Sequence, residues 1–239
     1  MTGGVLFDFD GTLADTFDDI VEAVQRMRAE LDGPALPPAE IRRHIGWGTR
    51  NLIGMCLPST DVLRPERLPP DGNTVQFDRT AVEDGLQRFE RIYEQVMVLT
   101  TQLYPGILEL CRSLAADGID LAVVSNKQDL FVRRMMAALR MIDPFRVVVG
   151  AGLTPRHKPD PSMLFLAAGG MGLPIDRCLM VGDGPLDIAS AKAAGIPCCA
   201  VSWGLLPADQ LIRLGPATLV HDARELDDWL RGMLRARAL

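Results

Sequence analysis

The chain has 239 residues, of which 48% are hydrophobic, so it can bury one sizeable core with enough residues left for a smaller second module. Its formal net charge of -6 argues against a surface that binds nucleic acid or an acidic membrane. Any phosphate that it binds must therefore be held by a few placed groups and a metal ion.

The cysteine pattern and the hydropathy indicate a reduced, intracellular protein. Its cysteines show no C-x-x-C spacing, so we expect them to be reduced core residues. No apolar run approaches the roughly 18 residues of a membrane span, and the chain enters a strand pattern at once without a leader. We therefore expect a cytoplasmic protein. The five cysteines are Cys56, Cys111, Cys178, Cys198 and Cys199.

The stretch 5–16 begins as an apolar, strand-like run that carries two aspartates two positions apart. Residues two apart in a strand point to the same side, so Asp8 and Asp10 are expected to face one site. Gly11 lets the backbone turn sharply before Thr12, which would leave amide N–H groups free to meet an anion. Two acids beside a tight turn suit a nucleophile and a proton donor working around a divalent cation.

The same D-x-D spacing also occurs in calcium-binding loops and in solvated strand ends. An EF-hand loop needs glycine at its sixth position, and counting from Asp8 that position holds Leu13, which excludes this alternative. A solvated strand end stays open for the motif alone. The rest of the chain must decide.

Helical spacing of apolar residues predicts a mostly helical block from about residue 16 to residue 98. Its first helix is expected to have a cap at Asp15 or Thr16. The segment 58–78 contains four prolines and little periodicity, and is predicted to be a long loop. The expected helices of this block cover 16–31, a short stretch from 38, 51–57 and 80–99.

After residue 104 the pattern changes to alternating helices and strands. Such alternation with continuously apolar strands predicts a parallel sheet that is covered on both faces. We expect strands at 119–124, 147–149, 178–181, 198–201 and 218–220, and helices at 107–116, 130–139, 161–171, 185–194 and 226–234.

The unusual polar residues gather where these predicted elements meet the edge of the sheet. Ligands of a parallel sheet bind at the carboxyl ends of its strands. Such a coincidence is harder to obtain by chance than any one motif. Asp8 and Asp10 follow the first strand, Ser125 and Asn126 the second and Asp183 a later one, while Lys158 lies in the loop before a helix.

Three polar side chains in this group suit phosphate. Lys158 is one of only three lysines, and as a compact cation on a stiff loop it suits pairing with a phosphoryl group and an attacking carboxylate. A solvated loop lysine is the alternative. Ser125 offers a hydroxyl and Asn126 an amide donor for phosphate oxygens, although both residues also form ordinary turns.

Asp183 and Asp187 stand four residues apart around a Gly-Pro helix start. Helix capping alone would account for them. Because Asp183 closely follows an apolar strand, we expect it beside Asp8 and Asp10, where three clustered acids need a cation. Oxygen ligands without a cluster of histidine or cysteine argue for magnesium, and the three histidines are too dispersed for zinc.

Taken together, these motifs resemble the haloacid dehalogenase superfamily and, within it, the phosphoglycolate phosphatases. Two further segments resemble those phosphatases: 45–52 their G-x-G segment, and 124–127 their T-N-K. The resemblance implies an α/β fold with a Rossmann-like parallel-sheet core at 1–15 and 99–239 and an all-helical cap at 16–98, inserted after the first strand. The matching motifs, in order, are Asp8-Phe9-Asp10-Gly11-Thr12, Ser125-Asn126, Lys158-Pro159, and Gly182-Asp183 with Asp187.

The resemblance also implies a two-step reaction. Asp8 would attack phosphorus to form an aspartyl-phosphate, and Asp10 would protonate the departing alkoxide and later activate the hydrolytic water. Magnesium would be held by the side chains of Asp8 and Asp183 and by the Asp10 carbonyl, with Asp187 in support.

The remaining implied roles concern the substrate. Its phosphoryl charge would be balanced by the metal, Lys158, Ser125 and Asn126, with Gly11 and Thr12 also in contact. A family cap closes over the site, which makes Thr49, Arg50 and His44 candidate substrate contacts, although each could equally be an ordinary exposed residue.

The sequence thus predicts a magnesium-dependent phosphomonoesterase for a small phosphorylated metabolite. A sugar-phosphate phosphomutase would use the same Asp8 and Asp10, and a non-catalytic phosphate-binding relative is a third possibility. A dehalogenase is disfavoured because it does not need the acid/base that Asp10 supplies. The protein is expected to be a monomer or a homodimer, because the apolar face of the helix at 80–99 can pack internally, which is the expectation, or against a partner.

Overall fold

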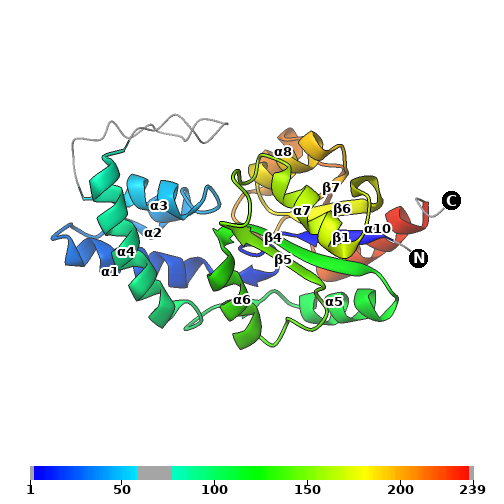
Figure 1. The fold of residues 1–239 in the computed structure, drawn as a ribbon, viewed down its shortest axis with the longest axis horizontal. Helices are drawn as coiled ribbons and strands as arrows, with labels where there is room; N and C mark the ends of the chain where they lie inside the picture. Colours follow the sequence, from blue (N-terminus) through cyan, green and yellow to red (C-terminus); the bar gives the residue numbers. More distant parts are fainter. Residues whose placement is uncertain (1–2, 59–76, 237–239) are drawn as a thin grey trace. The chain divides into compact units, whose positions relative to one another are not determined.

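The computed structural model describes residues 3–58 and 77–236, which separate into two compact units. The first, the core unit, is Met1–Asp15 with Gln102–Leu239, and the second, the helical unit, is Thr16–Thr101 (Figure 1). The helical unit thus extends to residue 101 rather than 98. The predicted loop at 58–78 falls, at 59–76, outside the described residues.

The core unit is built on a six-stranded sheet in the order β5-β4-β1-β6-β7-β8, in which every pairing is parallel. The chain runs from β1 to β4 and β5 on one side, and then to β6, β7 and β8 on the other. The strand order therefore reverses at β1, and it is at the carboxyl ends of the strands beside such a reversal that parallel sheets bind their ligands. The strands are β1 Gly4–Phe7, β4 Asp120–Gln128, β5 Val147–Ala151, β6 Cys178–Gly182, β7 Cys198–Val201 and β8 Thr218–Val220.

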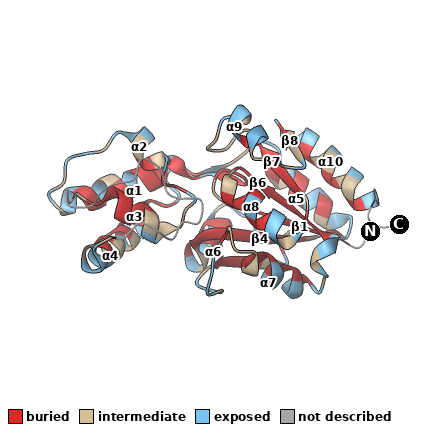
Figure 2. Cartoon of the chain, turned by 90° about the horizontal axis from the view of Figure 1, so that it is seen from above, coloured by how far each residue is buried: buried red, intermediate tan, exposed pale blue. Residues whose placement is uncertain are grey.

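Alternate residues of the strands build a core on each face of this sheet. Leu6, Ala122 and Met180 pack against the apolar faces of α7 and α8. Phe7 points to the other face, where its ring meets that of Phe145 edge-on at 6.0 Å. Figure 2 shows the strands buried and α10 alternating between buried and exposed residues. The helices are α5 Ile107–Ala116, α6 Asp129–Ala138, α7 Ser162–Met171, α8 Pro185–Ala194, α9 Ala208–Arg213 and α10 Ala223–Ala236.

The helical unit packs α1 against α4, with α3 also on α4. Its core includes Phe89 and Tyr93, whose rings stack at 5.2 Å, so the apolar face of α4 packs internally as predicted. Gly85 allows α3 to approach closely, because a Cβ there would lie 2.9 Å from Ile53 and Leu57. Its helices are α1 Phe17–Glu30, α2 Pro38–Arg42, α3 Thr49–Cys56 and α4 Arg79–Val96.

Buried Asp19 joins the two ends of the helical unit. Its carboxylate accepts hydrogen bonds from the backbone N–H groups of Thr100 and Thr101 and from both threonine hydroxyls, at 2.7–3.2 Å. These hydrogen bonds connect α1 to the segment that follows α4. The chain crosses into and out of the core unit at a two-residue antiparallel pair, β2 Ala14–Asp15 with β3 Gln102–Leu103.

Most predicted elements are confirmed within a few residues, and the differences have local causes. Thr16 is the N-cap of α1, but its side chain makes no capping hydrogen bond. The chain reverses at Asp32, whose φ of 54° is left-handed, one residue before the predicted Gly33. The patterns missed α9, a 3-10 turn at Ile175–Arg177 and the β2–β3 pair.

All five cysteines are buried thiols, as predicted. None of the helices in the described part of the chain combines the length and the apolarity that crossing a membrane requires.

Candidate active site

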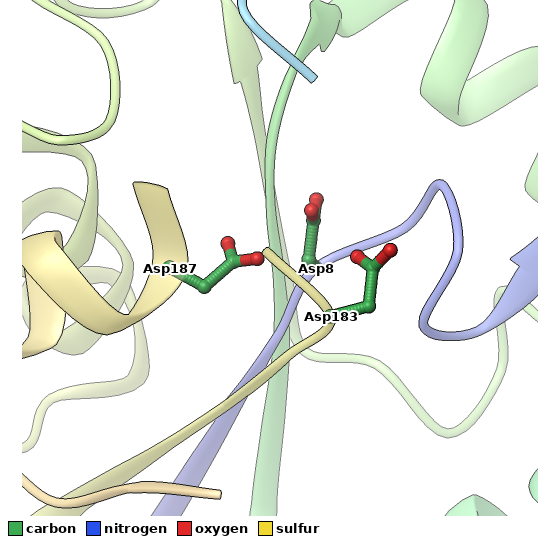
Figure 3. A group of neighbouring side chains, drawn as sticks. All are labelled: Asp8, Asp183 and Asp187. Carbon is green, nitrogen blue, oxygen red and sulfur yellow. The ribbon is translucent and has the colours of Figure 1, made fainter. Parts of the chain in front are cut away.

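Three carboxylates meet at the carboxyl edge of the central strands. Asp8 follows β1, Asp183 follows β6, and Asp187 lies in the first turn of α8. One oxygen from each lies within 4.8 Å of the others, and Figure 3 shows the Asp8 side chain between those of Asp187 and Asp183. The reversal of strand order at β1 brings these residues together.

Lys158 is the cation at the centre of this cluster. Its Nζ lies 2.9 Å from Asp8 Oδ1 and 2.6 Å from Asp187 Oδ1, and it donates a third hydrogen bond to the Val124 carbonyl at 2.9 Å. All three ammonium protons are thus directed at protein oxygens, and the side chain is 2% exposed. The sequence predicted a pairing of Lys158 with the expected nucleophile, Asp8, and the two side chains do lie in contact; the nucleophilic role of Asp8 stays a prediction.

Asp187 is held from two sides. Lys158 occupies Oδ1, and the Gly184 N–H donates to Oδ2 at 3.1 Å. A Cβ on Gly182 would lie 2.3–2.4 Å from the Asp187 carboxylate, so only glycine permits this approach. Asp187 therefore acts both as the helix-capping acid that the sequence allowed and as a member of the cluster.

Asp183 is held by Thr12 of the first motif and by residues after β7 that no motif indicated. Thr12 Oγ1 donates to its Oδ1 at 3.3 Å, and the Leu205 N–H donates to its Oδ2 at 2.8 Å. Gly204 lies so close that a Cβ there would be 2.2–2.5 Å from the Asp183 side chain. Trp203 Nε1 in turn donates to the Thr12 carbonyl at 3.1 Å. The only sequence signal for residues 203–205 is their position just after β7.

Burial and mutual repulsion change the acidity of this cluster. Burial, together with the negative charges of Asp187 and Asp10, raises the pKa of Asp8 to about 7, although Lys158 opposes the shift. Burial and then Asp187 and Asp8 hold the pKa of Asp183 well above its usual range. Burial opposes the charge on Lys158, but Asp187 and Asp8 outweigh it and raise the pKa of this lysine. The single positive charge of Lys158 is therefore too little to balance the three carboxylates when they are ionised.

Asp10 lies outside the group of three, contrary to the expected clustering of Asp8, Asp10 and Asp183. Its Oδ1 lies 2.6 Å from Lys127 Nζ. The third acid of the cluster is instead Asp187, because the first turn of α8 returns to the edge of the sheet beside Lys158.

The turn after Asp10 also differs from the expectation of free amides. Gly11 has a φ of 81°, as a sharp turn requires, but its N–H donates to the Ala14 carbonyl at 2.9 Å. The Thr12 N–H donates to the Phe9 carbonyl at 3.4 Å. These two amides close the turn itself, so the expectation that they face an anion is wrong.

The predicted phosphate ligands on β4 are buried, and they lie within the strand rather than after it. Ser125 Oγ accepts from the Lys127 N–H at 3.3 Å. The Asn126 carboxamide bonds to the backbone of Lys158 in both directions. Asn126 thus holds the loop that carries Lys158, a task that its sequence position did not reveal.

The candidate substrate contacts at 44–50 belong to the helical unit. Thr49 begins α3 and is half-buried, and exposed Arg50 pairs with Glu83 at 2.9 Å. His44 is buried within the segment between α2 and α3. Their contact with a substrate stays a prediction.

The charges of the site suit a divalent cation. Four aspartates (8, 10, 183 and 187) face two lysines (127 and 158), which leaves a formal excess of two negative charges if all are ionised. A divalent cation would cancel this excess, and carboxylate oxygens are ligands that such hard cations prefer. Within the described residues, the donor set therefore fits the predicted metal.

Comparisons with known proteins agree with this arrangement. The chain is 34% identical over 230 residues to a phosphoglycolate phosphatase of Rhodospirillum rubrum, covering 96% of this chain and 91% of that protein. It is 33% identical over 222 residues to one from Pseudomonas savastanoi pv. phaseolicola, covering 93% and 77%.

Solved structures show the same fold. One from Lactobacillus delbrueckii subsp. bulgaricus, described as a candidate phosphoglycolate phosphatase, superposes with a TM-score of 0.83 at 26% identity over 95% of this chain and 97% of that one. A candidate β-phosphoglucomutase from Thermotoga maritima superposes with a TM-score of 0.71 at 21% identity over 96% and 99%. The family model of haloacid dehalogenase-like hydrolases matches residues 5–201. The fold, the site geometry and these matches together mean that the chain belongs to the haloacid dehalogenase-like hydrolase family.

Proposed function

We propose that this protein is a magnesium-dependent phosphomonoesterase that acts on a small phosphorylated metabolite through an aspartyl-phosphate on Asp8. The observation that carries the proposal is the buried contact of Asp8 with Lys158, at 2.9 Å, inside a carboxylate cluster that lacks two positive charges. A nucleophile, a cation for the phosphoryl oxygens and a metal-binding donor set thus occupy one strand edge.

In the first step Asp8 forms a bond to phosphorus while the bond from phosphorus to the ester oxygen breaks. The Asp10 carboxyl group gives its proton to the departing oxygen. In the second step Asp10 takes a proton from water, which attacks the phosphorus, releases phosphate and restores the Asp8 carboxylate. Lys158 offsets the charge of the phosphoryl oxygens in both steps, and the Ser125 hydroxyl is a further donor for them.

Magnesium would be held by the side chains of Asp8 and Asp183 and by the Asp10 carbonyl, with Asp187 nearby. When bound, it would supply the positive charge that lets an anionic nucleophile approach an anionic substrate. Asn126 supports Lys158, while Gly11 and Thr12 shape the turn that carries Asp10.

The proposal assigns catalysis to the core unit and a cap function to the helical unit, with Thr49, Arg50 and His44 selecting the leaving group. Phosphoglycolate is the first substrate to test, because the related proteins from Rhodospirillum and Pseudomonas are phosphoglycolate phosphatases. We place the enzyme in the cytoplasm, as a monomer or a homodimer.

The test is phosphate release from 2-phosphoglycolate, sugar phosphates, pyrophosphate and nucleotides, with magnesium and with a chelator. We expect metal-dependent release, and a loss of at least about 1,000-fold in a folded Asp8→Asn variant, since its carboxamide is a poor nucleophile. Retained activity in Asp8→Asn would overturn the aspartyl-phosphate. Transfer of phosphate between sugar positions without net release would instead identify a phosphomutase, and a folded, inactive wild type would overturn the proposal.

A further inference from the structure

Lys127 and Asp10 form an ion pair separate from the carboxylate cluster. Lys127 Nζ lies 2.6 Å from Asp10 Oδ1, and the two side chains are only 7% and 13% exposed. Exposed ion pairs contribute little and recur by accident, whereas a buried pair requires close geometry to offset the cost of desolvation. This pair, formed across 117 positions of sequence, is therefore a built feature of the site.

The backbone of β4 is arranged to present Lys127. The register of β4 against β5 shifts between Val124 and Gln128, and the Lys127 N–H bonds to Ser125 Oγ. Such irregularities redirect the side chains of a strand near its end. Since β4 lies next to β1, the redirected lysine can meet Asp10, which follows β1 by three residues.

Lys158 cannot take over this task, because its three protons already serve Asp8, Asp187 and the Val124 carbonyl. The site therefore gives each of its two proposed reacting carboxylates a lysine of its own. The chain has only three lysines, against 22 arginines. Lysine suits the pairing, because an ammonium is a point charge that binds one carboxylate oxygen, whereas the fork of arginine tends to take both.

We propose that Lys127 is a positioning residue for the acid/base Asp10. By holding Oδ1 it restrains the orientation of the carboxyl group that gives its proton to the leaving oxygen and later accepts one from water. The inference rests on the proposed function and extends it to a residue outside the catalytic set given above.

The test uses two leaving groups. An alkyl phosphate such as 2-phosphoglycolate needs protonation of its departing oxygen, whereas p-nitrophenolate leaves readily without it. We expect Lys127→Met to lower kcat about 10- to 100-fold on the alkyl ester, within the usual contribution of general acid-base catalysis, with little change in KM. The loss on p-nitrophenyl phosphate should be smaller. Lys127→Arg should recover thermal stability but not kcat, since it keeps the charge but engages both oxygens.

The matched control is Lys192→Met, which removes the third lysine from the exposed side of α8, where Nζ bonds to the Leu214 carbonyl at 2.6 Å. It should leave kcat on both esters unchanged. A double-mutant cycle completes the test. If Lys127 acts through Asp10, adding Lys127→Met to Asp10→Ala should change kcat less than twofold.

Four outcomes would overturn the inference. A rise in KM that persists in the Asp10→Ala background would make Lys127 a substrate contact. Equal losses on both esters, additive with Asp10→Ala, would make its role structural. If the wild type hydrolyses both esters and Lys127→Met is unimpaired, the inference is rejected but the proposed function is not. If the folded wild type hydrolyses neither ester, both the proposed function and the inference are rejected.

Discussion

Asn126 and Lys158 exchange two hydrogen bonds in opposite directions. Asn126 Nδ2 donates to the Lys158 carbonyl at 2.9 Å, and the Lys158 N–H donates to Asn126 Oδ1, also at 2.9 Å. The carboxamide thus binds the backbone of the residue whose side chain contacts Asp8. Because these two hydrogen bonds are buried, they hold the Lys158 backbone in place. They thereby determine the position from which its side chain reaches Asp8.

Replacing Asn126 by Asp tests this relationship. The substitution keeps the acceptor but puts an oxygen in place of the donor, opposite the Lys158 carbonyl. We expect the free energy of unfolding to fall by about 1–3 kcal/mol, as for an unsatisfied buried group, and kcat to fall about 10- to 100-fold as Lys158 is displaced. Urea unfolding and steady-state kinetics provide the two measurements.

Asn51→Asp is the matched comparison, because Asn51 Nδ2 donates a single hydrogen bond to the Trp47 carbonyl at 2.8 Å in the helical unit. Its effect on unfolding should be smaller, since it loses one bond at a half-buried position. If Asn126→Asp weakened inhibition by inorganic phosphate while stability stayed the same, Asn126 would return to the phosphate-binding role that its sequence position indicated.

The acidity of Asp8 predicts a pH dependence of stability in the metal-free protein. The pKa of this carboxyl is 3.8 in the unfolded chain and about 7 in the folded one, where burial and neighbouring acids disfavour the charge. Between these values the folded state holds a proton that the unfolded state has released. This contribution to stability is complete below about pH 4 and is lost as the pH rises through 7.

A metal ion should reverse that loss, since it stabilises the ionised carboxylates. Magnesium is therefore expected to raise Tm more at pH 8 than at pH 5, where protons compete for the same oxygens. Thermal unfolding with magnesium and with a chelator at both pH values measures the difference. An equal shift at both, or a shift that survives in Asp183→Asn, would mean that the metal binds elsewhere.

Asp19 should matter for stability more than its neighbour in sequence. Asp19→Ala would leave the backbone and hydroxyl donors of Thr100 and Thr101 without their acceptor, which should cost about 3 kcal/mol. Asp18→Ala is the control, because Asp18 is 71% exposed and its ion pair with Arg42 lies at the surface, so the change should cost at most about 1 kcal/mol. Chemical denaturation of both variants measures this contrast. Similar costs would mean that Asp19 does not tie the ends of the helical unit together.

The fold could be predicted where its signals are local. The bounds of α8 and β7 were obtained from the sequence because continuous apolar runs and a Gly-Pro start mark them within a few residues. The sequence could not predict the β2–β3 pair or the contacts of Asp19 with Thr100 and Thr101. Each of these joins segments more than 80 residues apart, and each involves only two residues of a segment, too few to show a periodic pattern.

The candidate site divides in the same way. The motifs identified Asp8, Lys158 and Asp183, because each follows a strand or precedes a helix with a clear pattern. The contacts of Lys127 with Asp10 and of Lys158 with Asp187 depend on the register shift in β4 and on the first turn of α8, and neither leaves a mark in the sequence. For the same reason the sequence did not predict that Asn126 binds the backbone of Lys158, which lies 32 residues away.

Gly204, which the motifs did not indicate, lies against the Asp183 side chain. Gly204→Ala would place a Cβ 2.2–2.5 Å from the Asp183 side chain, so Asp183 must move away from Thr12 and Leu205. We expect magnesium affinity, measured by calorimetry, to fall at least about tenfold, which is the lower end of the usual effect of disturbing the support of a metal ligand. Gly232→Ala is the control: no atom lies within 4 Å of a Cβ there, and alanine should stabilise α10 by about 0.5–1 kcal/mol with unchanged affinity. Unchanged affinity in Gly204→Ala would show that Asp183 tolerates displacement, and would leave Asp8 and Asp187 as the principal ligands.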